Sequence, residues 1–422
     1  MPYMSRVRSM VCILVAVTLM VTLLSGSALA ASADSRRKIV MLDSPLTQEV
    51  LDLLEAAGIT VLYDLSLINA LAVLLPDPPL LALDPALALL EDLGEVYNDV
   101  LTLLDPICPT TAPPSAQEYR WGLQQIEAPA AHEQWPQPSE TGAVTVAVLD
   151  TGIASHSELN GRTVQGYNAI TGTQQTPDNN GHGTHMTGII LANKDGVGVS
   201  GVSGVEPKIE VAAVTVLDDT GAAYVSVVIE GLEWVLNNGI PLVNMSFGFS
   251  FSNPSDGTPL MKAIQKLYRA GIIMVASAGN RCTAGGASDD GGGDSCGPAA
   301  ACDDPLTAVT APASYGSWVI AVGATGFDQQ RAAYSLSGAV WAPGGEVDSG
   351  APDNGQILST NTGGIYGLGH GTSQAAAHVT GAAALALALE PGLTPDDMRN
   401  LLTQTAVAGR IDVKNMIEEL LP

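Results

Sequence analysis

The sequence predicts an α/β protein with a mostly parallel sheet flanked by helices, preceded by a small α+β domain. After Tyr119, short apolar runs such as "VTVAVLD" and "IIMVAS" alternate with helical segments. Such continuous apolar runs are typical of parallel strands that are buried on both faces of a sheet. Before position 105, the periodicity switches repeatedly between that of strands and that of helices, which predicts a separate, smaller unit.

Residues 1–30 have the composition of a signal peptide. Arg6 and Arg8 precede an apolar run, and the run leads into the small-residue site A-L-A at 28–30. This order of basic, apolar and small residues predicts secretion to the extracellular space, with cleavage after position 30. A retained membrane anchor is the alternative, but the apolar run is short for a span.

Residues 31–105 are expected to form the small domain. The expected elements are the strand Lys38–Leu42, the helix Gln48–Ala57, the strands Thr60–Asp64 and Ala70–Leu75, the helix Leu80–Leu93 and the strand Val96–Leu103. This β-α-β-β-α-β order predicts a ferredoxin-like sheet that carries two helices. The Pro- and Thr-rich stretch 106–118 predicts an exposed linker to the large domain, 119–422.

Polar residues stand where the apolar strands of the large domain are expected to end. They are Asp150, Asp218, Ser246 and Asn280. In open parallel sheets the functional residues gather at the carboxyl ends of the strands. This edge of the sheet is therefore the expected place of a site.

Charge and cysteine content limit the possible partners and the compartment. The 422 residues carry a formal net charge of −26, which argues against binding to nucleic acid or to an anionic membrane. Four cysteines remain once the signal peptide is removed: Cys108, Cys282, Cys296 and Cys302. An even number in an exported protein is typical of disulfides. We expect one bridge within 282–302, and the sequence does not define which pair forms it.

Four short motifs carry side chains suited to hydrolysis. "VAVLDTGI" ends a strand in Asp150, "GHGTHMTG" places His182 and His185 at a helix start, "ASAGN" follows a strand with Asn280, and "GTSQAAAHVTG" opens an Ala-rich helix with Ser373. Each polar residue alone has a simpler explanation as a turn or a helix cap, and the two histidines are also a possible zinc pair. Together they supply a nucleophile, a base, an orienting carboxylate and an oxyanion donor.

These motifs resemble those of the subtilisin family of serine proteases, the subtilases, and the resemblance covers nearly all of the chain after the signal peptide. The order Asp, His, Ser along the chain is that of subtilisin. The resemblance implies that Asp150, His182 and Ser373 form a catalytic triad and that Asn280 binds the oxyanion. The implied activity is that of a secreted endopeptidase that works through an acyl-enzyme. A catalytically silent binding protein on the same fold and a dedicated maturation protease are the alternatives.

The small domain resembles the propeptide of the family, which is an intramolecular chaperone and inhibitor. The resemblance implies an autoprocessed proform, with the cut between about Cys108 and Tyr119 in the linker. The expected partners are then polypeptide substrates and the chain's own propeptide. We expect a monomer that binds no nucleic acid and, after signal cleavage, no membrane.

The same resemblance implies that two strand edges hold an extended peptide substrate by β-augmentation. The residues implied are Gly221, Ala222 and Ala223 on one edge, Ser246, Phe247 and Gly248 on the other, and Tyr224 beside a pocket. The acidic, Gly-rich loop 281–304 follows Asn280. We expect a disulfide-pinned surface insertion there, with a calcium site or an acidic pocket for basic side chains as alternatives.

The stretch "LANKDGVGVSGV" resembles the calcium loop of the family. The implied ligands of a structural Ca²⁺ are the side chains of Glu158 and Asp195 and the backbone carbonyls of Asn193, Val197 and Val199. Oxygen donors of this kind suit Ca²⁺. An ordinary Gly-rich hairpin is the alternative.

Two residues depart from the serine motif of the family. Gln374 stands where Met is usual, and Ala377 stands where Pro is usual. Loss of the Pro removes a cause of helix irregularity. We expect an active enzyme whose helix differs slightly in geometry.

Overall fold

The computed structural model describes residues 36–76, 83–104, 107–110, 120–137, 140–281, 308–348 and 350–421. The chain divides into two compact units, Met1–Val100 and Leu101–Pro422, which are described separately below. The predicted signal peptide lies outside the described residues, as do Cys282, Cys296, Cys302 and nearly all of the acidic loop. No helix among the described residues is both long and apolar enough to cross a membrane.

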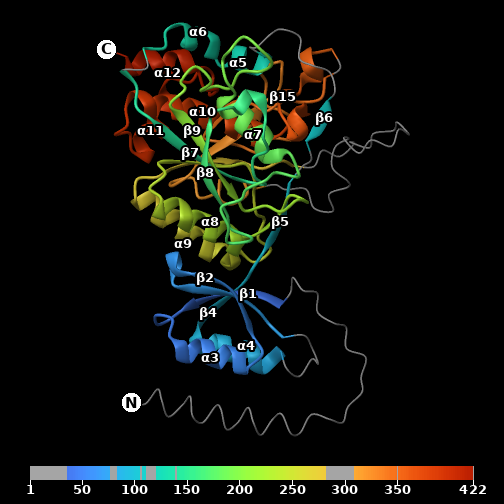
Figure 1. Cartoon of the computed structure of the whole chain (residues 1–422), viewed down its shortest axis with the longest axis vertical. Coiled ribbons are helices and arrows are strands. Elements are labelled where there is room, and N and C mark those ends of the chain that lie inside the picture. The colour runs from blue at the N-terminus through green and yellow to red at the C-terminus, as the bar shows by residue number, and fades with distance from the viewer. Residues whose placement is uncertain are drawn as a thin grey trace, which may run out of the picture. The chain divides into compact units, whose positions relative to one another are not determined.

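The first unit has the predicted β-α-β-β-α-β order. Its elements are β1 (Arg37–Leu42), α3 (Gln48–Ala56), β2 (Thr60–Leu65), β3 (Ala70–Leu74), α4 (Leu83–Leu93) and β4 (Gly94–Asn98). The strands pair in the order β2-β3-β1-β4, antiparallel throughout. Both helices lie on the same face of this sheet (Figure 1), where Leu54, Leu89 and Leu90 are buried against Val40 and Val73.

The prediction of one strand over Val96–Leu103 is wrong, because two strands cover this stretch. β4 ends at Asn98 and pairs with β1, and Leu101–Leu103 forms β5, which belongs to the second unit. The break falls at Asp99, whose buried carboxylate lies 2.9 Å from Arg37 Nη2. A buried carboxylate needs such a partner, so Asp99 anchors the end of β4.

The second unit is built on a seven-stranded sheet with the order β14-β13-β12-β11-β7-β9-β8. All of its strand pairs are parallel, as predicted. The strands are β7 (Val144–Asp150), β8 (Thr163–Asn168), β9 (Ile209–Thr215), β11 (Leu242–Met245), β12 (Ile273–Ser277), β13 (Ile320–Thr325) and β14 (Val340–Pro343). Buried apolar side chains on the central strands, such as Val146 and Val275, form its core.

Helices cover both faces of this sheet (Figure 1). They are α5 (Trp121–Gln125), α6 (Ala128–Glu133), α7 (His182–Leu191), α8 (Val225–Asn237), α9 (Thr258–Arg269), α10 (Thr372–Leu389), α11 (Pro395–Gln404) and α12 (Val413–Leu420). α7 and α10 pack together on one face, and α8 and α9 pack together on the other.

The composition of α10 follows from its central position. Every residue of this helix except Ser373 and Leu389 is buried. A helix that is apolar on all sides must be surrounded by other elements, and small Ala side chains let α7 and strands β11–β14 approach it closely. The helix runs without interruption through Ala377.

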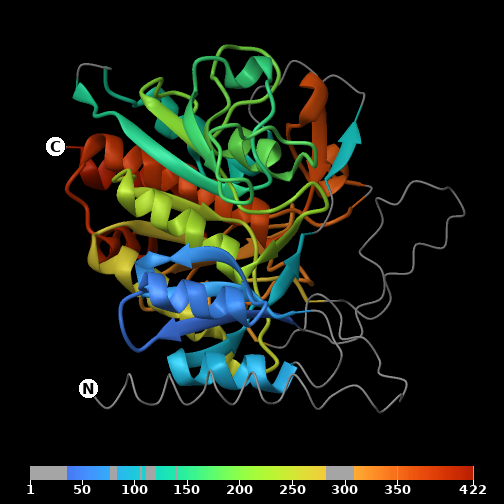
Figure 2. The ribbon, with the colours of Figure 1, turned by 60° about the horizontal axis from the view of Figure 1, so that its bottom comes forward.

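Two smaller sheets complete the second unit. One pairs β5 (Leu101–Leu103) with β10 (Ala222–Tyr224), and the other has the order β15-β16-β6. The strands of the latter are β6 (Cys108–Thr110), β15 (Ile357–Thr360) and β16 (Tyr366–Gly369). β6 appears as a separate cyan arrow at the edge of the orange-red β15–β16 hairpin (Figure 2).

Candidate active site

The predicted catalytic residues come together at the carboxyl ends of β7 and β11. β7 is the first strand of the large sheet along the chain, and later strands add on both of its sides. A reversal of strand order of this kind opens a crevice beyond the strand ends. Asp150 ends β7, and Ser246 directly follows β11.

Asp150 and His182 form a buried, hydrogen-bonded pair. Nδ1 of His182 lies 2.9 Å from both carboxylate oxygens of Asp150, and the two residues are 0% and 2% exposed. His182 is the first residue of α7, and Gly181 before it has a φ of 108°. Only glycine adopts such a backbone conformation readily, which explains the first glycine of "GHGTH".

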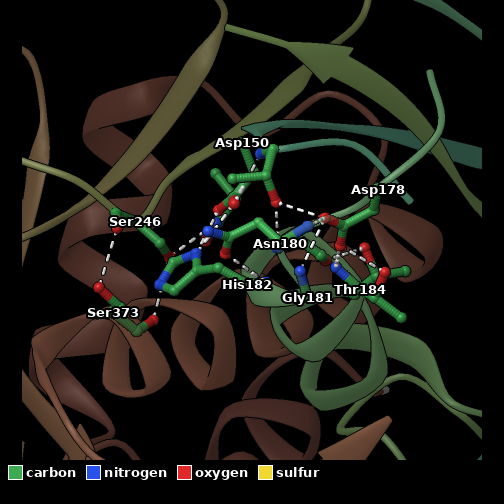
Figure 3. A network of polar contacts seen from close by, with 12 residues as sticks. Asp150, Asp178, Asn180, Gly181, His182, Thr184, Ser246 and Ser373 are labelled. Carbon is green, nitrogen blue, oxygen red and sulfur yellow. Dashed lines mark hydrogen bonds and ion pairs between the residues drawn. The ribbon is translucent and has the colours of Figure 1, made fainter. Parts of the chain in front are cut away.

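Ser373 is the second residue of α10 and stands on the far side of His182 from Asp150. Figure 3 shows its side chain beside the imidazole of His182. Its hydroxyl donates to the carbonyl oxygen of Ser246 at 2.8 Å, and the hydroxyl of Ser246 donates to the carbonyl of Ser373 at 3.0 Å. Ser373 is not the helix cap, because Gly371 takes that position. The crossed hydrogen bonds instead fix the start of α10 to the end of β11.

Asn280 is oriented by Thr372. The backbone N–H and the hydroxyl of Thr372 donate to Asn280 Oδ1 at 3.0 and 2.9 Å. Since a backbone N–H must face an acceptor, this contact fixes which end of the amide is the oxygen. The amide nitrogen lies near Gly371, where an added β-carbon would be 3.0 Å away from it.

Each predicted peptide-binding edge holds part of the chain itself. β5 pairs antiparallel with β10, with Leu103 opposite Ala222 and Thr102 opposite Ala223. The N–H of Leu104 donates to the carbonyl of Gly221 at 3.1 Å. The Thr102 hydroxyl donates to the carbonyl of Gly248 at 2.6 Å. An extended segment is therefore held between β10 and the 246–248 edge.

The other predicted residues at these edges have supporting roles. Phe247 is buried, and its carbonyl accepts a hydrogen bond from the Ser277 hydroxyl. Tyr224 ends β10 and precedes α8. Asp218 shapes the turn before β10, because its Oδ1 accepts from the N–H and hydroxyl of Thr220 and from the N–H of Ala222.

The chain is similar to proteins of a known family. The subtilase family model matches residues 141–418. The chain belongs to the subtilase family. Subtilisin amylosacchariticus of Bacillus subtilis subsp. amylosacchariticus is 39% identical over 295 residues, covering 69% of this chain and 67% of the relative. An alkaline protease of Alkalihalobacillus alcalophilus is 35% identical over 360 residues, covering 84% and 78%. This subtilase is accordingly a serine endopeptidase.

Gln374 of this subtilase directly follows Ser373 and is only 2% exposed. A β-carbon on Gly369 would come within 2.5 Å of its Nε2, so that glycine makes room for the amide. Its Oε1 is buried without a hydrogen-bond partner among the described residues. A buried acceptor without a partner costs about 1–3 kcal/mol, so the Gln374 side chain is expected to stabilise the start of α10 less than an apolar side chain of similar size would.

Glu158, one of the predicted calcium ligands, is 3% exposed and contacts the predicted calcium loop at Asn193. The N–H of Asn193 donates to the carbonyl of Glu158 at 2.8 Å, and the Tyr366 hydroxyl donates to Glu158 Oε1 at 2.6 Å. Burial, this hydrogen bond and the nearby charges of Glu158 and Asp195 raise the pKa of Tyr366. Carboxylate and carbonyl oxygens are the donors that Ca²⁺ prefers, so the predicted residue types fit this ion.

The rest of the predicted loop contains Asp195, Val197 and Val199. Asp195 Oδ1 accepts from the N–H of Val197 at 3.1 Å, while Val199 is buried. No cluster of three or more His, Cys, Asp or Glu side chains suited to a metal occurs among the residues that the structure describes. The predicted set contains two such side chains and otherwise backbone carbonyls.

His182 and His185 are not arranged as a zinc pair. His185 is fully buried, with Nε2 3.2 Å from the carbonyl of Ile357 and 3.1 Å from that of Gly367. Burial lowers the pKa of His185 to about 3, so its ring is neutral and donates to these carbonyls. His185 therefore holds α7 to β15 and β16.

Asp178, which was not predicted from the sequence, lies in the polar network around His182 (Figure 3). Its carboxylate accepts hydrogen bonds from residues on both sides of the Asp150–His182 pair. The one signal in the sequence was an Asp shortly before a helix whose cap position, Gly181, has no side chain.

Proposed function

We propose that this subtilase is a secreted endopeptidase that hydrolyses peptide bonds with Ser373 as nucleophile, His182 as base and Asp150 as orienting carboxylate. The observation that carries the proposal is the buried Asp150–His182 hydrogen bond, with Ser373 on the opposite side of the imidazole (Figure 3). Secretion is proposed on the composition of residues 1–30.

The geometry supports a specific role for each of the three groups. Since Asp150 accepts from Nδ1, the neutral His182 carries its proton there and leaves Nε2 free of a proton as the base. The Ser373 hydroxyl turns from the Ser246 carbonyl towards the ring and gives its proton to Nε2 as Oγ attacks the substrate carbonyl. His182 then protonates the leaving amine, and water hydrolyses the acyl-enzyme by the same route.

The oxyanion of each tetrahedral intermediate is proposed to bind the Asn280 amide and the backbone N–H of Ser373. Thr372 holds Asn280 in place before substrate binds. Donors fixed in this way need no reorganisation as charge develops, which is why such groups contribute strongly to catalysis.

Replacement of Asn280 by Ala should lower kcat by about 10²–10³-fold with little change in KM, the range known for the equivalent residue of subtilisin. The donor acts on the transition state more than on bound substrate. Steady-state kinetics on a peptide anilide measure both constants. Unchanged kcat in Asn280→Ala would remove Asn280 from the oxyanion site.

Substrates are proposed to bind as β5 does, as an extended strand between β10 and the 246–248 edge. The contacts along this segment are largely to backbone groups, and the Leu103 side chain is 67% exposed. Recognition through backbone hydrogen bonds fits an endopeptidase that accepts many polypeptides.

The same contacts support autoprocessing of a proform in which the first unit is the propeptide, acting as chaperone and inhibitor. Leu104 directly follows β5, the strand that pairs with β10. Ile107 directly precedes β6, the strand that pairs with β16. Methyl groups of Ile107 lie against Gly367 and Gly369, and Gly369 stands four residues before Ser373. We therefore propose that the first cut falls within 104–107, just upstream of the region between about Cys108 and Tyr119 that was expected from the sequence.

Incubation of the purified full-length chain tests this function. The expected result is a new N-terminus within 105–107 by Edman sequencing, hydrolysis of unrelated peptides, and loss of both activities after treatment with a fluorophosphonate. A chain that neither cuts itself nor reacts with the fluorophosphonate would be the catalytically silent alternative. Cleavage of one substrate sequence only, in a peptide library, would identify a dedicated maturation protease.

We also propose that a structural Ca²⁺ is bound by the side chains of Glu158 and Asp195 and by the carbonyls of Asn193, Val197 and Val199. The ion would neutralise the two carboxylates and tie the loop to the residues after β7.

Removal of calcium with EDTA should lower the Tm of the mature enzyme by about 5–10 °C. Binding at 100-fold excess over Kd contributes about 2.7 kcal/mol, and about 2–4 °C accompanies each kcal/mol in a large domain. Calorimetry with and without added calcium measures the shift, and Glu158→Gln should show a smaller one. Equal Tm values for the wild-type enzyme in EDTA and in calcium would contradict the site.

A further inference from the structure

We infer that Asp178 is a positioning residue, which fixes the start of α7 to the end of β7 and so sets the angle at which His182 meets Asp150. This inference rests on the proposed triad, because it concerns the orientation of the proposed base. Asp178 lies on the loop before α7 and is 5% exposed.

The Asp178 carboxylate accepts five hydrogen bonds. Oδ1 accepts from the Thr151 hydroxyl at 2.9 Å, the Asn180 N–H at 3.0 Å and the Gly181 N–H at 2.8 Å. Oδ2 accepts from the N–H and the hydroxyl of Thr184 at 2.9 and 2.6 Å. Every one of these partners is a donor, so the site requires a group that only accepts, which is an ionised carboxylate.

Asp178 takes over the capping of α7. The cap position is Gly181, which has no side chain to satisfy the free N–H groups of the first turn. Asp178 reaches across the cap to the N–H of Thr184, in the first turn of α7. A negative charge at a helix N-terminus also interacts favourably with the helix dipole.

The second half of the link runs through Thr151, the residue after Asp150. Its hydroxyl donates to Asp178 and accepts from the N–H of Gly183, while its own N–H donates to Asp150 Oδ1 at 2.8 Å. Asp178 is thus linked to Asp150 through Thr151, and to His182 through the first turn of α7.

The close approach of the two elements makes this link sensitive to small shifts. A β-carbon on Gly183 would lie 2.2 Å from the carbonyl oxygen of Gly152 and 3.1 Å from Cβ of Asp150. α7 therefore contacts the loop after β7 backbone to backbone. A change in the tilt of α7 moves the imidazole of His182 directly, since His182 is its first residue.

The test is Asp178→Asn, which keeps the size of the side chain and places an NH₂ group where one oxygen was. The new NH₂ group would face only donors. These are the N–H and hydroxyl of Thr184 if it replaces Oδ2, and the Thr151 hydroxyl and the N–H groups of Asn180 and Gly181 if it replaces Oδ1. We expect kcat to fall by about 10- to 100-fold, because a misplacement of about 1 Å has effects of this order. KM should stay within about twofold, since the hydrogen bonds of Asp178 itself go to residue 151 and to the start of α7, and not to β10 or the 246–248 edge. Both constants are measured per active site titrated with a fluorophosphonate.

A spectroscopic measurement reports on the orientation itself. The proton shared by His182 Nδ1 and Asp150 should give a low-field ¹H NMR signal in the mature wild-type enzyme. In Asp178→Asn this signal should shift or broaden, while a purely structural role would lower Tm and leave the signal and kcat unchanged.

Glu206→Gln is the matched control. Glu206 is 0% exposed and accepts from Trp135, Thr141 and the N–H of Lys208. Glu206 precedes β9, the parallel neighbour of β7, and so lies at the amino ends of these strands. Asp150 lies at their carboxyl ends. Loss of this carboxylate should lower Tm without changing kcat or the low-field signal.

Should Asp178→Asn yield no mature enzyme, Thr151→Val removes the link to β7 and keeps the carboxylate contacts with α7. A several-fold loss of kcat at constant KM is expected. Wild-type kcat and an unchanged signal in whichever variant matures would overturn the inference. If Ser373→Ala is inactive in the same experiment, that result rejects only the role of Asp178 and not the proposed triad. An active Ser373→Ala would reject the triad itself.

Discussion

Ser373→Ala should lower kcat for peptide hydrolysis by about 10⁶-fold, the size of the loss known for the equivalent change in subtilisin. Without the hydroxyl, no acyl-enzyme can form, and only the binding and oxyanion groups remain to accelerate attack by water. The same variant should accumulate as an uncut proform, which gel electrophoresis and intact mass measure directly.

Ser359→Ala is a suitable control for this substitution. Ser359 is buried in the same unit, and its hydroxyl donates to the carbonyl of His185. Its loss should affect stability and leave the chain able to mature. Efficient self-cleavage of a Ser373→Ala proform, in a preparation free of wild-type enzyme, would contradict the nucleophile assignment.

Asp150→Asn should lower kcat by about 10⁴-fold while the fold stays intact. The Asn side chain offers an NH₂ to His182 Nδ1, so the imidazole takes the tautomer with its proton on Nε2 and cannot accept the proton of Ser373. Kinetics on active sites counted by titration measure the loss, and circular dichroism and Tm verify the fold.

The contrast for this substitution is Asp412→Asn. Asp412 caps α12 through the N–H of Asn415, and Asn is about as good a cap as Asp, so activity should be unchanged. A fall of less than about tenfold in Asp150→Asn would mean that Asp150 does not control the tautomer of His182.

The large sheet was predictable because its strands are buried on both faces. Runs such as "VTVAVLD" have few other possible structures, and β7 confirms the prediction. The four polar positions at the strand ends and helix starts were predictable for a related reason, since short motifs of glycine and polar residues mark those positions locally. The structure brings Asp150 and His182 together, as the motifs imply.

Pairing between distant segments was not predictable in the same way. Leu101–Leu103 has the composition of a strand, but nothing in its pattern shows that its partner is β10 rather than β1. The buried ion pair of Asp99 with Arg37, which ends β4, depends on contacts across 62 positions of the chain. The wrong prediction of one strand over Val96–Leu103 follows from these two facts.

The supporting groups of the site depend on tertiary contacts too. Asp178 caps α7 because Gly181 leaves the cap position without a side chain. Gln374 is buried because other elements surround α10, and its Oε1 has no hydrogen-bond partner among the described residues. The disulfide expected within 282–302 lies outside the described residues and stays a prediction.

Covalent labelling is a direct test of whether His182 activates the hydroxyl of Ser373. Mature enzyme is treated with a fluorophosphonate, digested with trypsin and analysed by tandem mass spectrometry. We expect one phosphonylated residue, Ser373, with labelling abolished in Ser373→Ala and strongly slowed in His182→Ala. An enzyme that hydrolyses peptides at full rate while Ser373 stays unlabelled, or that carries the label on another residue, would contradict it.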